Sequence, residues 1–408
     1  MNQFITTSMI LQESLAILKN NCQFARYVNR QYDGQFARSG AKVGATVNAR
    51  KPPKYQGRYG NALQPEDIVE TPVPVTVDKL FGVDLEFTDV DLTLTMDAFR
   101  SRYIEPAVTR IANEIDATGL QLYNQVFNAV GTPGTVPADD TDYLNAGVKL
   151  DNTGTPRRGR NTRTAVIGSQ MQATLVHGLK GLFQSAEKIR EQYEDGEMGY
   201  ALGLNFSMDQ NVYTHTVGPL GGTPLVNGAN QTGANLVTDG WTAAAASRLL
   251  KGDIFTIAGV YGVKPQTSSP SGSVSTGVPQ QFVVTDDVSS DGAGNATIPI
   301  SPSIIVAGPF ATVNSLPADN AALTVLGAAN AVTPQGLVFH RDFATLVMVD
   351  LEMPKGVDMS GRIVDEDTGF ALRLVRAYDV RTNTRPVRIE ALWGWAVLYP
   401  EMACRVAS

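Results

Sequence analysis

A long run of alternating residues, 71–94, limits the fold of this chain more than any other feature of its sequence. Apolar side chains take every second position, and the phase shifts once near Thr88 and Asp89. A period of two places alternate side chains on opposite faces of a strand, and a shift of one residue is typical of a β-bulge. The run therefore predicts strands with one buried face. Its apolar positions are Val73, Val75, Val77, Phe81, Val83, Leu85, Phe87, Val90, Leu92 and Leu94.

The next segment, 96–128, changes to helical spacing. A continuous helix here would be more than twice the usual length of about 11 or 12 residues. Pro106 lies inside the segment, and it either begins a second helical segment or kinks a continuous one, because its ring blocks the bond to the preceding turn. A shorter amphipathic helix is predicted for residues 8–19. The apolar residues of the long segment are Phe99, Tyr103, Val108, Ile111, Ile115, Leu122 and Val126.

The segments between these elements are less regular. Residues 20–60 predict an extended arm that becomes the first strand of a long hairpin, with Gly57 and Gly60 near its tip. Residues 131–163 are rich in Gly, Pro, Asp and Thr, which predicts a surface loop. Further predictions are a strand at 164–168, a helix from Ser169 to about Phe183, and strands joined by turns at 199–213.

Composition changes again in the second half of the chain. From Pro265 to His340 there is no lysine or arginine, and the charged residues are four aspartates. Strand-forming residues recur there, for example at 253–257 and 281–285, and the turn cluster 291–295 separates two such runs. The sequence therefore predicts a separate small β domain at about 223–334. Residues 335–408 return to charged, alternating strands that suit a half-buried sheet.

Charge is distributed unevenly along the chain, whose net charge is −7 with only 18% charged residues. Residues 1–60 hold nine basic and two acidic side chains, whereas residues 61–91 hold eight acids and one lysine. Two oppositely charged neighbouring segments can pair within one subunit or between subunits, or both can simply be solvated. Candidate assembly contacts are Lys19, Arg26, Arg30, Arg50, Lys51, Lys54, Arg58, Glu66, Asp67 and Glu70.

No motif of catalysis, metal binding or cofactor binding is found in the sequence. The three histidines lack metal-ligand spacing, and there is neither a phosphate-binding loop of the Walker type nor a Gly-x-Ser-x-Gly elbow. Cys22 and Cys404 do not suggest a disulfide framework, and Trp393 and Trp395 suit strand packing better than a ligand platform. No apolar run approaches a membrane span, and the N-terminus lacks the features of a secretion signal. We therefore expect no catalytic, cofactor or metal site.

The order of these elements resembles the Hong Kong-97-type capsid fold of tailed phages. Residues 100–116 are similar to the spine helix of that family, residues 199–206 to the strands that lead into its axial domain, and residues 337–343 to the strand that returns from it. Residues 388–406 resemble its closing strands. Two further stretches, 251–260 and 295–303, resemble the insertion domain of podovirus coat proteins of the Salmonella phage type.

This resemblance implies an α+β capsid fold with an inserted, barrel-like β domain. It also implies a major capsid protein that self-assembles as hexamers and pentamers into an icosahedral shell around double-stranded DNA, which it contacts non-specifically. A separate scaffolding protein, a portal protein and a decoration protein are the implied partners, with assembly in the bacterial cytoplasm. The implied parts are an N-terminal arm (1–40), an extended hairpin (41–93), a spine helix (94–130), a peripheral domain with the body strands (131–198 and 335–408), the way into the axial domain (199–222) and the inserted domain (223–334).

Two alternatives remain open at this point. A β-rich virion or cell-surface binding protein, such as a fibre or a carbohydrate-binding module, would show repeats or aromatic ligand platforms, and neither is clear in this sequence. An enzyme ranks third because the motifs of catalysis are missing.

Overall fold

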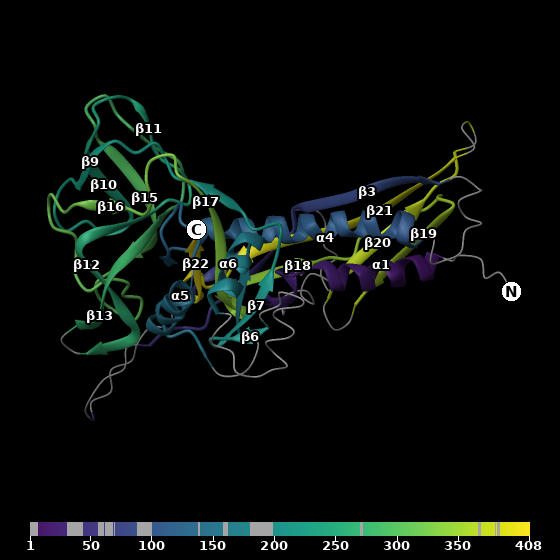
Figure 1. Cartoon of the computed structure of the whole chain (residues 1–408), viewed down its shortest axis with the longest axis horizontal. Helices are drawn as coiled ribbons and strands as arrows, with labels where there is room; N and C mark the ends of the chain where they lie inside the picture. Colours follow the sequence, from purple (N-terminus) through teal and green to yellow (C-terminus); the bar gives the residue numbers. More distant parts are fainter. Residues whose placement is uncertain are drawn as a thin grey trace. The chain divides into compact units, whose positions relative to one another are not determined.

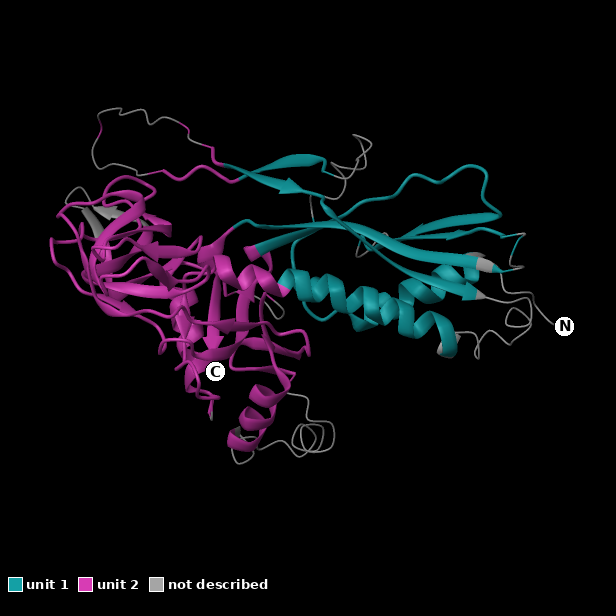
Figure 2. Ribbon diagram, turned by 90° about the horizontal axis from the view of Figure 1, so that it is seen from above, with its two compact units in different colours: residues 1–50, 72–119, 344–398 teal, residues 51–71, 120–343, 399–408 magenta. Residues whose placement is uncertain are grey.

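The computed structural model describes residues 7–30, 44–55, 61, 68, 70–87, 100–137, 139–157, 162–179, 199–269, 272–365, 369–379, 381 and 384–408. The chain divides into two compact units, coloured separately in Figure 2. Unit 1 comprises Met1–Arg50, Pro72–Gly119 and Ala344–Leu398, and unit 2 comprises Lys51–Thr71, Leu120–Phe343 and Tyr399–Ser408. Among the described residues, no helix is long and apolar enough to span a bilayer.

Unit 1 is built on an antiparallel sheet with two helices along one face (Figure 2). Its strand order is β18 (Ala344–Met348), β21 (Arg385–Val397), β20 (Ala371–Arg376) and β19 (Met359–Val364), and β3 (Lys79–Phe87) also pairs with β21. The predicted alternation is present at the start of β21, where Val387 and Ile389 are buried and Arg388 is exposed, but from Ile389 to Trp393 every residue is buried. The helices are α1 (Thr7–Asn21) and α4 (Glu105–Leu120).

The N-terminal segment is held to α4 by one buried carboxylate. Asp116 accepts hydrogen bonds from the backbone N–H groups of Gln23, Phe24 and Ala25, at the start of the 3₁₀-helix η1 (Ala25–Tyr27). Further along, Asn29 forms a parallel bridge with Thr345 in β18. The described part of the predicted arm, from residue 7 to residue 30, is therefore packed within its own unit.

The long predicted helix is divided into three pieces. Arg100–Ile104 is a π-helical turn, Glu105–Leu120 is α-helical, and Gln121–Gln125 is the 3₁₀-helix η4. Pro106 is the second residue of α4, so its missing N–H lies where the π-helical turn changes to the α-helix. The sequence left open whether Pro106 kinks a continuous helix or begins a second segment, and the α-helical segment begins at Glu105, directly before it.

The hairpin differs from the prediction in its pairing. Strand β1 (Thr46–Arg50) pairs with β2 (Pro72–Thr76) in a two-stranded sheet, whereas β3 belongs to the sheet of unit 1. Gly394 in β21 lies so close to the carbonyl oxygen of Thr76 that a Cβ at this position would collide with it. The predicted bulge at Thr88–Asp89 and the tip at Gly57 and Gly60 lie outside the described residues.

Unit 2 contains a mixed sheet that we call the body sheet. Its strand order is β4 (Ala129–Val130), β22 (Ala403–Ala407), β17 (Val332–His340), β5 (Arg163–Ile167), β7 (Leu204–Met208) and β6 (Tyr200–Ala201), and β8 (Thr214–Thr216) pairs with β17. Helix α6 (Ser169–Leu179) begins where the sequence predicts. Short 3₁₀-helices, η5 (Arg341–Phe343) and η6 (Pro400–Met402), follow β17 and precede β22.

Helix α5 (Thr141–Asn152) occupies a segment that the sequence analysis assigned to a surface loop. Its buried face is narrow, with Tyr143, Ala146 and Leu150 packed in the core of the body sheet. Leu144 and Val148 are exposed, so the apolar pattern has no clean helical period. The narrow buried face, the exposed apolar residues and the Gly and Pro residues on either side explain why periodicity did not predict this helix.

The inserted β domain is a six-stranded antiparallel sheet that nearly closes on itself (Figure 1). Its order is β16 (Leu323–Val325), β12 (Ile254–Ser269), β13 (Gly272–Val284), β15 (Ala296–Ile304), β10 (Gly233–Trp241) and β9 (Gly222–Val226). A bridge between Leu225 and Ala322 brings β9 back to the residues before β16. A small ladder of β11 (Ala246–Leu249) and β14 (Val288–Ser290) lies beside it. Phe255 and Phe282 stack in the core at 5.8 Å between ring centroids.

Candidate functional site

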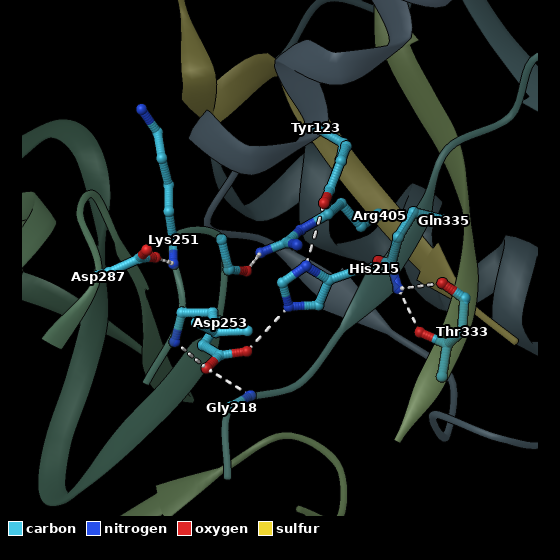
Figure 3. Close-up of polar contacts among 11 residues, drawn as sticks. Tyr123, His215, Gly218, Lys251, Asp253, Asp287, Thr333, Gln335 and Arg405 are labelled. Carbon is cyan, nitrogen blue, oxygen red and sulfur yellow. Dashed lines mark hydrogen bonds and ion pairs between the residues drawn. The ribbon is translucent and has the colours of Figure 1, made fainter. Parts of the chain in front are cut away.

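Four buried polar residues meet where the inserted domain joins the body sheet (Figure 3). We call Tyr123, His215, Asp253 and Arg405 the root cluster. They come from η4, β8, the residue before β12, and β22, respectively. The root cluster thus draws on both body elements and the inserted domain.

His215 is the central member of the root cluster. Its Nε2 lies 2.8 Å from Oδ1 of Asp253, and its Nδ1 lies 3.0 Å from the hydroxyl of Tyr123. A carboxylate only accepts hydrogen bonds, so a neutral His215 donates from Nε2 and accepts from Tyr123 at Nδ1. The other oxygen of Asp253 accepts from the N–H groups of Gly218 (3.0 Å) and Leu250 (2.8 Å).

Arg405 supplies the cation of the root cluster. Its side chain is 1% exposed, its Nη2 donates to the carbonyl of Gly252 at 2.8 Å, and its guanidinium lies 5.4 Å from the ring centroid of Tyr123. Burial lowers the pKa of Arg405 to about 10, which leaves it charged at neutral pH, and burial raises the pKa of Tyr123 to about 12. A buried arginine and a buried Asp253 carboxylate therefore balance each other within the root cluster.

The Asp–His–Tyr order resembles a proton relay, but the space beside it does not suit a substrate. The pocket lined by His215, Gly252, Gln335 and Arg405 has a volume of about 20 Å³, and a single water needs about 10–15 Å³. The described residues contain no group of three or more His, Cys, Asp or Glu side chains arranged to hold a metal ion. The geometry suits a structural joint, in which buried and mostly hydrogen-bonded polar groups specify one packing arrangement. Among the described residues, Nε of Arg405 is the one side-chain atom of the root cluster that is buried without a hydrogen-bond partner.

A second polar contact joins the inserted domain to the body sheet. The Gln281 side chain pairs with the backbone of Ala129, accepting from its N–H and donating to its carbonyl, each at 3.0 Å. Lys149 of α5 also donates to Oε1 of Gln281 at 3.0 Å. Burial lowers the pKa of Lys149. Neither this contact nor the root cluster has a local sequence signature, because the partners are far apart along the chain.

The basic residues predicted for the N-terminal arm contact their own chain. Lys19 forms an ion pair with Asp365 at 3.0 Å. Arg30 donates to the carbonyl of Gly369 at 3.0 Å and lies 4.5 Å from the ring centroid of Phe370. Arg26 lies 6.0 Å from the ring centroid of Tyr27. Any role of Lys19, Arg26 and Arg30 between subunits stays a prediction.

The remaining candidate contacts belong to the hairpin and the segment after β1. Lys51 and Lys54 lie 5.1 Å and 5.9 Å from the ring centroids of Tyr399 and Phe310. Burial lowers the pKa of Lys51, which fits the position of its stem against an aromatic ring. Arg50 ends β1 opposite Pro72, Glu70 is exposed before β2, and Arg58, Glu66 and Asp67 lie outside the described residues.

One face of the sheet in unit 1 carries a ladder of ion pairs that the sequence analysis did not identify as a unit. Arg388 binds both carboxylate oxygens of Asp84, at 2.6 and 3.1 Å, and this hydrogen bonding lowers the pKa of Asp84. Arg373 binds the buried Glu390 at 2.6 Å. These groups line a pocket of about 500 Å³ together with Pro354 and other residues. Alternation predicts the polar face, but it does not predict which charges pair across it.

Comparisons with known proteins identify the family. The chain matches the family described as "P22 coat protein - gene protein 5" over residues 1–405. No curated protein matches this chain in sequence.

Similar solved structures include a chain of Mycobacterium phage Che8, with 14% identity, 94% of this chain and 90% of that chain covered, and a TM-score of 0.42. They also include the capsid of Ralstonia phage GP4, with 7% identity, coverages of 95% and 87%, and a TM-score of 0.46. These scores are too low to add to the family match. That match confirms the expected capsid fold and favours the coat protein over a fibre or an enzyme. The chain belongs to the P22 coat protein family and is the major capsid protein of a tailed phage, the subunit of a homo-oligomeric shell.

Proposed function

We propose that this coat protein assembles as hexamers and pentamers of an icosahedral shell, with the help of a separate scaffolding protein and around a portal. Assembly in the bacterial cytoplasm, closure around double-stranded DNA and a possible decoration protein belong to the same proposal. The observation that supports it most is the family match over residues 1–405. Repetition by symmetry allows individually weak contacts to hold a closed shell.

The β1–β2 ribbon is the element that we propose for contacts between subunits. Within the described residues it forms a two-stranded sheet of its own, and one face is buried at Ala49 and Val75. The other face is exposed at Thr46, Asn48, Pro72 and Pro74, and a neighbouring subunit would pack against these positions. Lys51 and Lys54, which follow β1, are candidates for pairing with acidic groups of that neighbour.

We further propose distinct roles for the other parts. Residues 1–40 act as the N-terminal arm, 94–130 as the spine helix, and 131–198 with 335–408 as the peripheral domain and body strands. Residues 199–222 lead into the axial domain, and 223–334 are the inserted domain. The buried, charge-balanced root cluster supports a fixed junction for this last part, since such a joint resists reorientation. Basic side chains on an inner face would contact packaged DNA without reading its sequence.

The assembly proposal is tested by expressing the protein with the neighbouring structural proteins of its phage and examining the products by negative-stain electron microscopy. Closed shells, or spirals of the same subunit, are expected. The double variant Lys51→Glu and Lys54→Glu is expected to reduce shell yield, while Lys355→Glu, an exposed charge reversal in unit 1, serves as the matched control. Monomers alone from the wild type with its scaffold present would contradict the proposal. If the double variant and the Lys355→Glu control lose the same shell yield, the proposed contact of the β1–β2 ribbon with a neighbouring subunit is contradicted.

A further inference from the structure

The loop between β9 and β10 carries the single Asn–Gly pair of the sequence, Asn227-Gly228. Both residues are exposed. The backbone of Asn227 is hydrogen-bonded, since its N–H donates to Val237 and its carbonyl accepts from Gln231. Among the described residues, its side-chain carboxamide has no hydrogen-bond partner. The carboxamide is therefore available for reaction with the backbone nitrogen that follows it.

The N–H of that following residue points at a carboxylate. Gly228 donates to Oδ1 of Asp319 at 2.8 Å, and the other oxygen of Asp319 accepts from the side chain of Asn320 at 3.0 Å. A base within hydrogen-bond distance of a proton is positioned to remove it. Gly228 also has no Cβ to shield its nitrogen, and its φ of +91° suits glycine. The loop thus combines an unhindered nucleophile, a positioned base and a free carboxamide.

We propose that Asn227 is a site of spontaneous deamidation promoted by Asp319. The nitrogen of Gly228 bonds to Cγ of Asn227 while its proton passes to Asp319. The bond from Cγ to the side-chain nitrogen breaks, and that nitrogen takes up the proton and leaves as ammonia. The resulting succinimide is opened by one water molecule at either carbonyl, which gives aspartate or isoaspartate at this position. Water is the sole co-reactant.

Other exposed asparagines in the inserted domain provide an internal comparison. Asn230, Asn320 and Asn330 lie in the left-handed region, at φ values of 62°, 60° and 58°, whereas Asn227 does not. Each is followed by a residue with a Cβ, namely Gln231, Ala321 or Ala331. That carbon crowds the attacking nitrogen, so these sites react more slowly. Of these four exposed asparagines, only Asn227 is followed by a glycine.

The modification has a local physical consequence. It adds a negative charge beside Asp319, and the isoaspartate form lengthens the backbone by one methylene group. Gln231 currently bridges the loop, donating to the carbonyls of Asn227 (2.7 Å) and Val237 (2.9 Å). A longer backbone at residue 227 disturbs this bridge. Ageing coat protein would thus become heterogeneous at one exposed loop of the inserted domain.

The test uses the purified full-length protein, incubated at neutral pH and sampled over time by peptide mapping and by isoaspartyl methyltransferase labelling. Conversion is expected at Asn227 and not at Asn230, Asn320 or Asn330. The variant D319N keeps a hydrogen-bond acceptor but cannot take up the proton. It is expected to slow conversion by about tenfold, which is a smaller effect than a well-placed base has on the rate of an enzyme.

Two results would overturn the proposal, in different ways. If Asn227 stays intact in the folded protein while a synthetic peptide of the same loop sequence converts, the fold protects the site. If D319N converts at the wild-type rate with an unchanged melting temperature, Asp319 is not the base.

Discussion

Nε2 of His215 lies 2.8 Å from Oδ1 of Asp253, and this pair connects strand β8 of the body sheet to the residue before β12 in the inserted domain. The same carboxylate accepts two backbone N–H groups and shares the buried space with Arg405. Its negative charge is thus satisfied from several directions. The inserted domain is joined to the body by more than the chain connections alone.

Removal of this charge is expected to destabilise the protein strongly. Asp253→Asn would remove the negative charge near the buried Arg405 and weaken the buried hydrogen bonds from His215, Gly218 and Leu250, at a cost of about 1–3 kcal/mol. The expected result is a lower midpoint in guanidinium unfolding followed by circular dichroism. Asp286→Asn, at an exposed turn, is the matched control and is expected to change stability by less than about 0.5 kcal/mol. If Asp253→Asn and Asp286→Asn lower the unfolding midpoint equally, the Asp253 carboxylate does not stabilise the root cluster.

A methyl group at Gly394 is expected to disturb the contact between β2 and β21. The Cβ of Gly394→Ala would overlap the carbonyl oxygen of Thr76, so one strand must move. Overpacking of this kind costs about 1–3 kcal/mol. Gly292→Ala is the control, because nothing lies within 4 Å of its added Cβ. Thermal unfolding of both variants measures the difference, and similar melting temperatures would contradict the close approach.

Loss of the Asp116 carboxylate is expected to loosen the N-terminal segment. Asp116→Ala leaves the backbone N–H groups of Gln23, Phe24 and Ala25 without their acceptor. Each unsatisfied buried donor costs about 1–3 kcal/mol. Hydrogen exchange at residues 22–27 is expected to speed up, while exchange in the inserted domain stays unchanged. Uniform acceleration across the chain would instead indicate global destabilisation.

Histidine 340 is expected to make stability depend on pH. Burial lowers the pKa of His340 below 6.5, and its Nδ1 accepts a hydrogen bond from the N–H of Asp342 at 3.2 Å. The unfolded chain therefore binds a proton more readily than the folded one. By linkage, stability is lost as the pH falls from about 6.5 toward the folded pKa.

The variant His340→Gln tests this linkage through denaturant midpoints measured between about pH 7 and pH 5. The variant is expected to lose less stability over this range than the wild type. His177→Gln, on the exposed side of α6, should retain the wild-type slope. A parallel pH profile for His340→Gln and the wild type would refute the assignment.

Local elements were predictable from sequence where one period dominates. The helix at 8–19 and the strand at 164–168 correspond to α1 and β5, and the alternating strands expected within 335–408 include β20 and β21. Helix α5 was missed because its buried face is three residues wide and its exposed face carries Leu144 and Val148. The sequence indicated an irregularity at Pro106, but it did not show whether the helix is kinked or divided there. The π-helical turn before α4 is seen only in the structure.

Where one period dominates, the sequence by itself determined which face of a strand or helix is buried, because periodicity reports the face that avoids water. It also determined the low-charge composition of the inserted domain and the order of elements that resembles a phage capsid protein. Tertiary structure alone decided the partners. Arg388 meets Asp84 across 304 residues of chain, and Tyr123 meets His215 across 92. A pattern in the sequence carries no information about distance between such positions, so the ion-pair ladder and the root cluster exist only once the strands have paired.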